Sequence, residues 1–198
     1  MFIGWSDQMP HEYTVVQIPY EATKDWILNI HYAKRMPSIS YAYGLYRYDE
    51  MVGMVSYGSP ASPSLCKGIC GEEYKSDVIE LNRLVLKDNL PNEASFLVAR
   101  SLKLLPKPKV VVSYADAGGQ YHTGFVYQAT NFLFTGTTKP RTDIAGKDGK
   151  HSRHHLGDIT KRVARTAKHR YVYFIGSKRE RKVLREALRY PVLDYPKP

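Results

Sequence analysis

The sequence has few of the features that mark secreted, membrane-spanning or zinc-binding proteins. Only two cysteines, Cys66 and Cys70, occur among its 198 residues, and their C-x3-C spacing matches neither a zinc-finger nor a thioredoxin-type motif. No apolar run approaches the ~18 residues that a membrane-spanning helix needs. Residues 1–10 lack the basic start and apolar stretch of a signal peptide. We therefore expect reduced thiols and a cytoplasmic protein with no membrane partner.

Several catalytic and nucleotide-binding motifs are also missing. The chain contains no P-loop, no Gly-x-Gly-x-x-Gly fingerprint and no signature of a Ser/His/Asp triad. The sequence therefore gives no support to a hydrolase or to an enzyme that binds nucleoside triphosphates. Its 43% hydrophobic and 12% aromatic residues suffice for an ordinary core, which excludes disorder of the whole chain.

Acidic residues are outnumbered in the C-terminal third of the chain. Residues 139–198 hold 17 basic and 6 acidic residues, a net charge of +11, whereas residues 1–138 hold 12 basic and 13 acidic residues, a net charge of −1. Such an excess indicates a polyanionic partner. We expect one domain over residues 1–198, with residues 139–198 as the basic, DNA-binding portion of that domain.

Strand-like and helix-like segments alternate along the chain. Strands are expected at residues 13–20, 41–48, 51–57, 78–86, 109–114, 134–138 and 171–175. Helices are expected at residues 21–36, 92–105 and 125–132 and after Ser177, with Asn92 and Ser177 as N-caps. Residues 60–75 and 138–158 are expected to be loops. This order predicts an α/β (α+β) fold: a mixed central sheet with antiparallel N-terminal strands, a parallel central pair and helices on both faces.

The strand at residues 109–114 places candidate catalytic residues at its carboxyl end, where ligands bind in such sheets. Ser113 and Asp116 lie at this end, and Tyr127, Gln128 and Asn131 follow on the next helix. A carboxylate beside a phenol suits proton transfer, or the binding of a metal or a nucleobase edge. The alternative is that Asp116 caps the next segment and that Tyr127 only packs.

A family resemblance rests on four short motifs, which are His31-Tyr32, Glu80-Leu-Asn-Arg83, Ser113-Tyr-Ala-Asp116 and Tyr127-Gln-Ala-Thr-Asn131. The element order and the tyrosine-containing helix that ends in Asn-Phe resemble the GNAT acyltransferase superfamily. More narrowly, the four motifs resemble the Mom DNA-modification proteins of Mu-like phages, over roughly residues 13–195. Those proteins are GNAT-related enzymes that convert adenine in phage DNA to N6-carbamoylmethyladenine and so blunt host restriction. The resemblance implies a GNAT-like sheet and a phage-encoded transferase in the host cytoplasm.

The resemblance also implies roles for individual residues. His31, Tyr32 and Asp116 match positions around the family's active site, where they are candidate iron ligands, and Tyr127 matches a tyrosine near the group donor. We expect Asp116 to orient the adenine amine and Tyr127 to protonate the leaving oxygen. Further candidate contacts to the base, the donor or phosphate are Ser113, Asn82, Arg83, Gln128 and Asn131.

One segment departs from the pattern of acetyl-CoA-dependent GNAT enzymes. Those enzymes have a Gly-rich loop before the helix that begins here near Asn92, because backbone N–H groups cradle a pyrophosphate there. This chain has no glycine in residues 87–95, and it has Asp88 and Glu93 where phosphate would lie. We therefore expect an activated glycine donor such as glycyl-tRNA, which supplies the atoms of the transferred group, in preference to acetyl-CoA.

The last helix carries a cationic stripe opposite Val183, Leu184 and Leu188. The stripe consists of Lys178, Arg181, Lys182, Arg185 and Arg189, with Glu180 and Glu186 as counter-charges. Charged helix faces are often only solvated, but so large an excess predicts phosphate binding, to double-stranded DNA or to a tRNA donor. To reach an adenine inside a duplex, such an enzyme has to flip the base out of the stack.

Other features leave alternatives open. His151, His154 and His155 lie in the expected loop at residues 138–158, where solvent exposure or DNA contacts are favoured over a metal site. A homodimer is one candidate for the oligomeric state. The competing functions are a GNAT-type N-acyltransferase that acts on another amine, and a non-catalytic basic protein that binds nucleic acid.

Overall fold

The computed structural model describes residues 12–118, 123–144 and 162–197. The main sheet has seven strands in the order β1-β2-β3-β4-β5-β9-β6. Their bounds are β1 (Tyr13–Gln17), β2 (Tyr41–Arg47), β3 (Glu50–Gly58), β4 (Val78–Leu86), β5 (Lys109–Asp116), β6 (Leu133–Thr137) and β9 (Lys168–Ile175). A separate two-stranded ribbon pairs β7 (Arg141–Ile144) with β8 (Arg162–Arg165).

The sheet is mixed, as the sequence predicts. β4 and β5 run parallel, whereas the pairs β1·β2, β2·β3, β3·β4, β5·β9 and β6·β9 are antiparallel. Val110, Val111 and Val112 of β5 are fully buried, which fits an apolar central strand that is covered on both faces.

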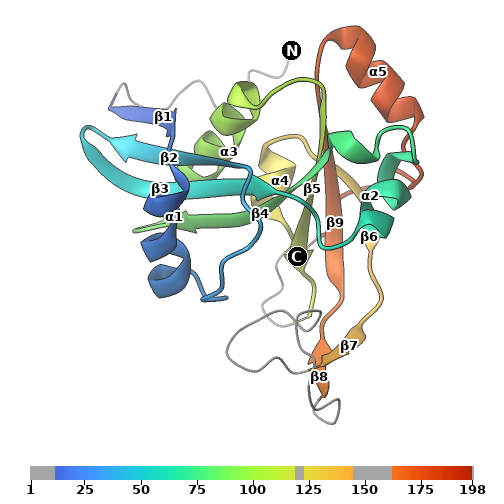
Figure 1. Ribbon diagram of the computed structural model, residues 1–198, viewed down its shortest axis with the longest axis horizontal. Helices are drawn as coiled ribbons and strands as arrows, with labels where there is room; N and C mark the ends of the chain where they lie inside the picture. Colours follow the sequence, from blue (N-terminus) through green and yellow to red (C-terminus); the bar gives the residue numbers. More distant parts are fainter. Residues whose placement is uncertain (1–11, 119–122, 145–161, 198) are drawn as a thin grey trace.

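Helices cover both faces of this sheet (Figure 1). Their bounds are α1 (Tyr20–Asp25), the π-helix η2 (Trp26–Ile30), α2 (Pro63–Cys70), the 3-10 turn η3 (Lys75–Asp77), α3 (Glu93–Leu104), α4 (Phe125–Ala129) and α5 (Lys178–Glu186). α3 and the residues after α4 bury Leu97 and Phe132 against one face. On the other face, η2 packs Ile27 against the N-terminal half of the sheet, while α2 and α5 bury Ile69 and Leu184 against β5 and β9.

Two expectations for the N-terminal half are wrong. The helix expected at residues 21–36 ends at Ile30, because His31 takes up an extended conformation and its N–H closes the last turn on Trp26. His31 and Tyr32 therefore follow the helix instead of lying in its last turn. Residues 60–75 are not only a loop, since they form α2, which Ser62 caps by accepting a hydrogen bond from Leu65 N–H at 3.3 Å.

Three further differences concern the rest of the chain. Asn92 does precede α3, but its backbone is left-handed and its side chain makes no capping hydrogen bond. The capping box of Ser177 and Glu180 is confirmed, whereas Val183, expected to face inward, is 40% exposed. The expected loop at residues 138–158 contains β7, and its residues 145–158, with His151, His154 and His155, lie outside the described residues.

Within the described ranges, no helix is both long and apolar enough to cross a membrane. Both cysteines are free thiols, and Cys70 is buried.

A close backbone approach at the end of β3 fixes the segment that follows η2. A Cβ atom on Gly58 would lie 1.8 Å from the carbonyl oxygen of Ser38, so any side chain there must push residues 37–40 away from the sheet. We predict that Gly58→Ala lowers the free energy of unfolding by about 1–3 kcal/mol, as measured by urea denaturation.

Gly68→Ala is the matched control for this prediction. Its Cβ meets only the Tyr190 hydroxyl, at 3.1 Å, and alanine favours the helix over glycine by about 1 kcal/mol. If Gly58→Ala were as stable as Gly68→Ala, the close approach would not constrain the fold.

Candidate active site

The sheet parts between its two parallel strands. β4 and β5 pair only where Val78, Ile79 and Glu80 face Val110, Val111 and Val112. Beyond this point β4 stays with β3, and β5 continues with β9. The next carbonyl of β4, that of Leu81, accepts a hydrogen bond from Ser113 Oγ at 3.0 Å. A buried carbonyl needs a donor, so the fully buried Ser113 supplies it where the strands separate.

Tyr127 of α4 lies against this point of separation. Its ring packs 5.3 Å from the ring of Tyr171, which faces Ser113 across the β5·β9 pair, and 5.4 Å from the ring of Phe132. Burial raises the pKa of the Tyr127 phenol to about 12, although hydrogen bonding with Ser113 lowers it in part. The phenol therefore keeps its proton at neutral pH and can donate it.

His31 and Tyr32 lie on the approach to the split from η2. The two rings stack with centroids 4.3 Å apart, His31 being buried and Tyr32 87% exposed. Burial and the positive charge of Arg83 lower the pKa of His31 to about 4, so this histidine is neutral at physiological pH. Tyr32 and Glu80 also raise the pKa of Tyr127, which places both within electrostatic reach of the phenol.

Arg83 is a half-buried cation held by backbone. Its guanidinium donates to the carbonyls of Arg35 at 2.9 Å and Asn82 at 2.6 Å. The Nε atom of Arg83 is buried and has no hydrogen-bond partner, and no ion pair of Arg83 is found within the described residues. Burial lowers the pKa of Arg83. An anionic or carbonyl-bearing group would satisfy this orphaned N–H.

Asn82 and Gln128 make structural contacts. The Asn82 side chain accepts from Ser56 Oγ at 2.7 Å and donates to the carbonyl of Ser38 at 2.7 Å. Gln128 Nε2 donates to the carbonyl of Thr123 at 2.8 Å and to the Tyr171 hydroxyl at 3.2 Å. Both amides thus brace the walls of the site, and a direct substrate contact by either of them stays a prediction.

Asp116 has a similar anchoring role. Its Oδ1 atom accepts from Gly118 N–H at 3.0 Å and from Thr166 Oγ1 at 2.5 Å. Side chains alternate along a strand, so Asp116 points to the face of β5 opposite to that of Ser113. The capping role weighed as an alternative is therefore present, and a catalytic role of Asp116 stays a prediction.

The residues matched to iron ligands do not fit a metal. His31 Nδ1 accepts the N–H of Ala33 at 3.0 Å, which leaves the ring proton on Nε2 in the neutral imidazole and no free lone pair. The Asp116 carboxylate holds Gly118 and Thr166. Within the described part of the chain, no three His, Cys, Asp or Glu side chains gather as metal ligands would. The described residues therefore give the iron hypothesis no support.

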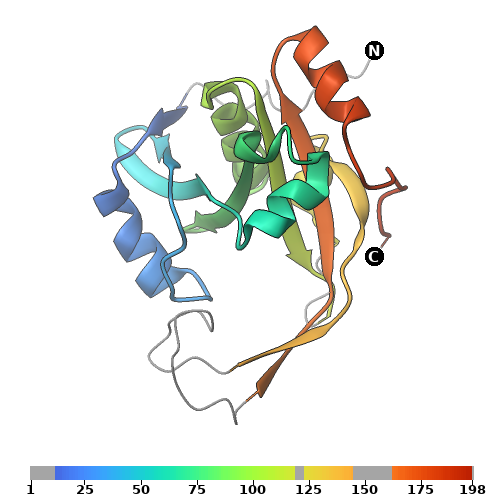
Figure 2. The same ribbon diagram turned by 45° about the vertical axis from the view of Figure 1, so that its right-hand side comes forward.

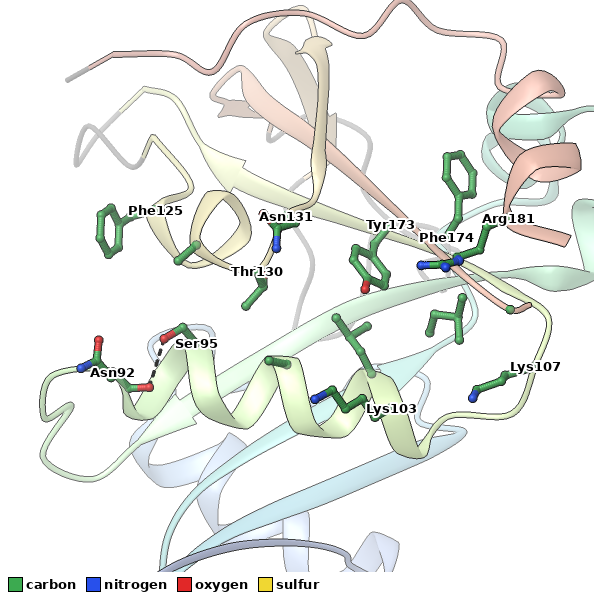
Figure 3. Close-up of a pocket in the computed structure, with 15 residues that line it drawn as sticks. Asn92, Ser95, Lys103, Lys107, Phe125, Thr130, Asn131, Tyr173, Phe174 and Arg181 are labelled. Atoms are coloured by element: carbon green, nitrogen blue, oxygen red, sulfur yellow. Dashed lines mark hydrogen bonds between the residues drawn. The ribbon is translucent and has the colours of Figure 1, made fainter. Parts of the chain in front are cut away.

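A cavity of about 630 Å³ lies beside the split, between α3, α4 and β9. Figure 3 shows Asn92, Ser95 and Phe125 at one end, and the cations Lys103, Lys107 and Arg181 at the other. The buried ring of Phe132 packs 5.1 Å from Tyr173, which lines the cavity, and 5.4 Å from Tyr127. Phe132 thus stands between this cavity and the Tyr127 phenol.

Sequence reasoning missed most of this cavity. Asn131 and Arg181 were expected to bind ligands, and both line it. Lys103 and Lys107 were not singled out, because cations at the end of a helix are also favoured by its dipole. No local pattern distinguishes the two roles.

The N-terminus of α3 carries a buried acidic residue. Glu93 is 1% exposed, and its carboxyl group accepts from the N–H of Leu90 at 2.9 Å and from the Tyr13 hydroxyl at 3.1 Å. A helix N-terminus binds phosphate through free N–H groups and a positive dipole. An acidic side chain at this position weakens that attraction for an anion.

All five residues of the cationic stripe are exposed, but one of them lies outside the helix. Lys178, Arg181, Lys182 and Arg185 lie on the helix, whereas α5 ends at Glu186 and Arg189 lies beyond it. The backbone N–H of Arg189 bonds to Ile69 of α2. Figure 1 shows α5 at the end of β9 that is opposite to the ribbon.

The sheet order and the parting of its parallel pair define the GNAT acyltransferase fold. Among solved structures, the acetyltransferase yncA of Salmonella typhimurium, determined with acetyl-CoA, is similar with a TM-score of 0.52 at 9% identity, over 84% of this chain and 96% of that one. This likeness concerns the fold alone. The chain matches the model of the Mom protein family over residues 12–197, and it belongs to that family.

One curated relative carries a functional name. The methylcarbamoylase Mom of Escherichia phage Mu is 32% identical over 113 residues, which are 54% of this chain and 46% of the relative. The chain thus matches about half the length of this relative.

The buried His31 predicts a pH dependence of stability. Its pKa is about 4 in the folded protein, against an ordinary 6.5, so the unfolded chain binds the proton first as the pH falls. The stabilisation is complete above pH 6.5 and is lost toward pH 4, by up to about 3 kcal/mol. We expect the free energy of unfolding of the wild type to fall over this range more steeply than that of His31→Asn.

Asparagine keeps an acceptor for the Ala33 N–H but does not titrate in this range. Urea denaturation at a series of pH values measures the difference, and parallel curves for the two proteins would contradict the buried, neutral state of His31.

Proposed function

We propose that this protein is a transferase that converts adenine in DNA to N6-carbamoylmethyladenine, and so protects phage DNA from host restriction. Membership of the Mom family and the name of the phage Mu relative support a DNA-modifying transferase. The observation that carries the proposal is the Tyr127 phenol, which lies with Ser113 where β4 and β5 part. Acyl transfer to an amine needs a proton donor of this kind.

The proposed chemistry starts with the adenine amine as nucleophile. The N6 nitrogen attacks the carbonyl carbon of an activated glycine, the bond from that carbon to the leaving oxygen breaks, and the proton that N6 loses restores the Tyr127 phenol after it has acted. Tyr127, protonated at neutral pH because burial raises its pKa to about 12, gives its proton to the leaving oxygen. A rearrangement of the glycyl adduct, which has the same atoms, then yields the carbamoylmethyl group.

Other residues have proposed positioning roles. The unpartnered Nε of Arg83 would bind a carbonyl or phosphate oxygen of base or donor. Tyr32, 87% exposed over His31, offers a face on which a flipped base can stack. Such positioning matters because the adenine amine is a weak nucleophile.

The donor we propose is an aminoacyl ester of glycine such as glycyl-tRNA. The buried Glu93 at the start of α3 disfavours the pyrophosphate of acetyl-CoA. The cavity is lined by Lys103, Lys107 and Arg181, and Arg181 belongs to α5 with its other exposed cations. We assign the phosphate-bearing part of the donor to this end of the molecule, so that the α5 stripe serves the donor at least as much as DNA.

The first test is nucleoside mass spectrometry of plasmid DNA from cells that express the protein. We predict an adenine adduct with a mass gain of C2H3NO, and a loss of at least about 100-fold in Tyr127→Phe, because a general acid contributes 10²–10⁴ in rate. Phenylalanine keeps the packing against Tyr171 and Phe132, so the variant should stay folded.

Tyr48→Phe is the matched control, since Tyr48 is 72% exposed and its hydroxyl donates to Glu12. Full activity of Tyr127→Phe would refute its role. A different adduct would favour another acyltransferase, and DNA binding with no adduct would favour a non-catalytic nucleic-acid-binding protein.

The second test concerns the donor in a purified system. We predict modified adenine with glycyl-tRNA and none with acetyl-CoA, because the acetyl group lacks the nitrogen of the carbamoylmethyl product and because the acidic Glu93 lies at the start of α3. Liquid chromatography with mass spectrometry of the digested DNA measures the product. Modification that proceeds with acetyl-CoA and no aminoacyl-tRNA would exclude the proposed donor.

A further inference from the structure

The segment that follows α5 crosses the edge of the main sheet. β6 is the edge strand, and Figure 2 shows this segment beside it. The N–H of Leu193 donates to the carbonyl of Phe134 at 3.0 Å, and the two residues form an antiparallel bridge. An edge strand presents unpaired backbone groups, and the bridge pairs some of those on β6. We call residues 189–195 the C-terminal strap.

The start of the strap is anchored on the far side of β6. The N–H of Arg189 donates to the carbonyl of Ile69 in α2 at 2.9 Å. The guanidinium carbon of Arg170, in β9, lies 3.3 Å from the centre of the Tyr190 ring. A cation over an aromatic face is attracted to it. The strap therefore leaves α2 and β9 from a fixed position.

Tyr195, near the end of the strap, contacts the chain just after α4. Its hydroxyl donates to the carbonyl of Phe132 at 2.8 Å, and its ring lies 6.5 Å from the ring of Tyr171. Phe132 is fully buried, whereas Tyr195 is 41% exposed. The carbonyl of a buried residue needs a donor, and Tyr195 supplies one from the surface.

Phe132 in turn holds the candidate proton donor. Its N–H donates to the carbonyl of Tyr127 at 2.9 Å, and the two rings pack 5.4 Å apart. Asn131, the residue before it, has a left-handed backbone with φ at 61°, so the chain turns sharply at this point. Because Phe132 binds Tyr195 through its carbonyl and Tyr127 through its N–H and ring, a shift of Phe132 also moves the phenol.

We infer that Tyr195 is a positioning residue for the proposed transfer reaction and acts on the Tyr127 phenol through Phe132. The inference rests on the proposed function, because Tyr127 is the proton donor in that reaction. Proton transfer depends on the placement of the donor, and a misplacement of about 1 Å can cost about 10²-fold in rate. The hydroxyl of Tyr195 is the group that fixes this placement from outside the site.

The test removes the hydroxyl of Tyr195 from the full chain. We predict that Tyr195→Phe lowers kcat for adenine modification by about 10-fold, with KM for DNA within about twofold of the wild-type value, because the variant keeps every substrate contact. Liquid chromatography with mass spectrometry of the digested DNA measures the product over time. Phenylalanine keeps a ring beside Tyr171, so the variant should stay folded.

Tyr190→Phe is the matched control. It removes a hydroxyl from the same strap, but it keeps the ring beneath Arg170 and leaves the bond from Tyr195 to Phe132 in place. Its kcat should equal that of the wild type. Full activity of Tyr195→Phe, or an equal loss in Tyr190→Phe, would overturn the inference.

A double variant separates positioning of the phenol from a general structural role. In a Tyr127→Phe background, Tyr195→Phe should lower the residual kcat by less than about twofold, since the hydroxyl that it positions is already absent. A purely structural role predicts the same loss of about 10-fold in both backgrounds. Equal losses would therefore overturn the inference.

Native-state hydrogen exchange tests the same link without the reaction. The N–H of Phe132 should exchange about 3- to 10-fold faster in Tyr195→Phe than in the wild type or in Tyr190→Phe, because one hydrogen bond that opposes local opening is lost. The N–H of Val111, in the central strand β5, should keep its rate. An equal change at Val111 would indicate global destabilisation and would contradict the inference.

These measurements distinguish failure of the inference from failure of the proposed function. If the wild type forms no modified adenine, the proposed function fails, and the exchange rates of Phe132 and Val111 decide whether Tyr195 holds Phe132. If the wild type is active and Tyr195→Phe changes neither kcat nor exchange, the inference fails and the proposed function stands.

Discussion

The hydrogen bond from Ser113 Oγ to the carbonyl of Leu81 lies where the two parallel strands stop pairing. A sheet cannot part in its interior without leaving backbone groups unsatisfied, and a small hydroxyl residue on β5 meets this demand. Hydrogen bonding with the same serine lowers in part the raised pKa of the Tyr127 phenol. One residue therefore satisfies the backbone where the strands part and acts on the phenol beside the opening. The neutral His31, the exposed Tyr32 and the half-buried Arg83 add stacking and polar groups on the approach from η2.

Basic residues lie at both ends of β9. β9 carries the ribbon with its arginines at one end and α5 at the other. The net charge of the C-terminal third indicates only that a partner is polyanionic. Among the described residues of that third, the arginines of the ribbon and the cations of α5 lie at opposite ends of β9.

Much of this architecture could be predicted from the sequence. The apolar strand at residues 109–114, the strands at residues 41–48 and 51–57 and the capping box at Ser177 all have strong local signals, and each is present. The four motifs also mark the family to which the chain belongs. The remaining features depend on contacts that local sequence patterns do not show. His31 lies outside the helix and accepts the N–H of Ala33. Glu93, at the start of α3, accepts a hydrogen bond from Tyr13, 80 residues away in the sequence. The hydrogen bond from Thr166 to Asp116 likewise joins residues that are distant in the sequence. By contrast, Ser62-Pro63 is a local signal for a helix start, within a segment whose composition otherwise resembles a loop.

The most direct test of this account is an experimental structure of the full chain bound to a duplex with its target adenine. The account predicts a base flipped into the split between β4 and β5, with its N6 atom beside Tyr127 and Ser113. An adenine held in the cavity of α3, α4 and β9, or a duplex bound along α5 with the split empty, would contradict it.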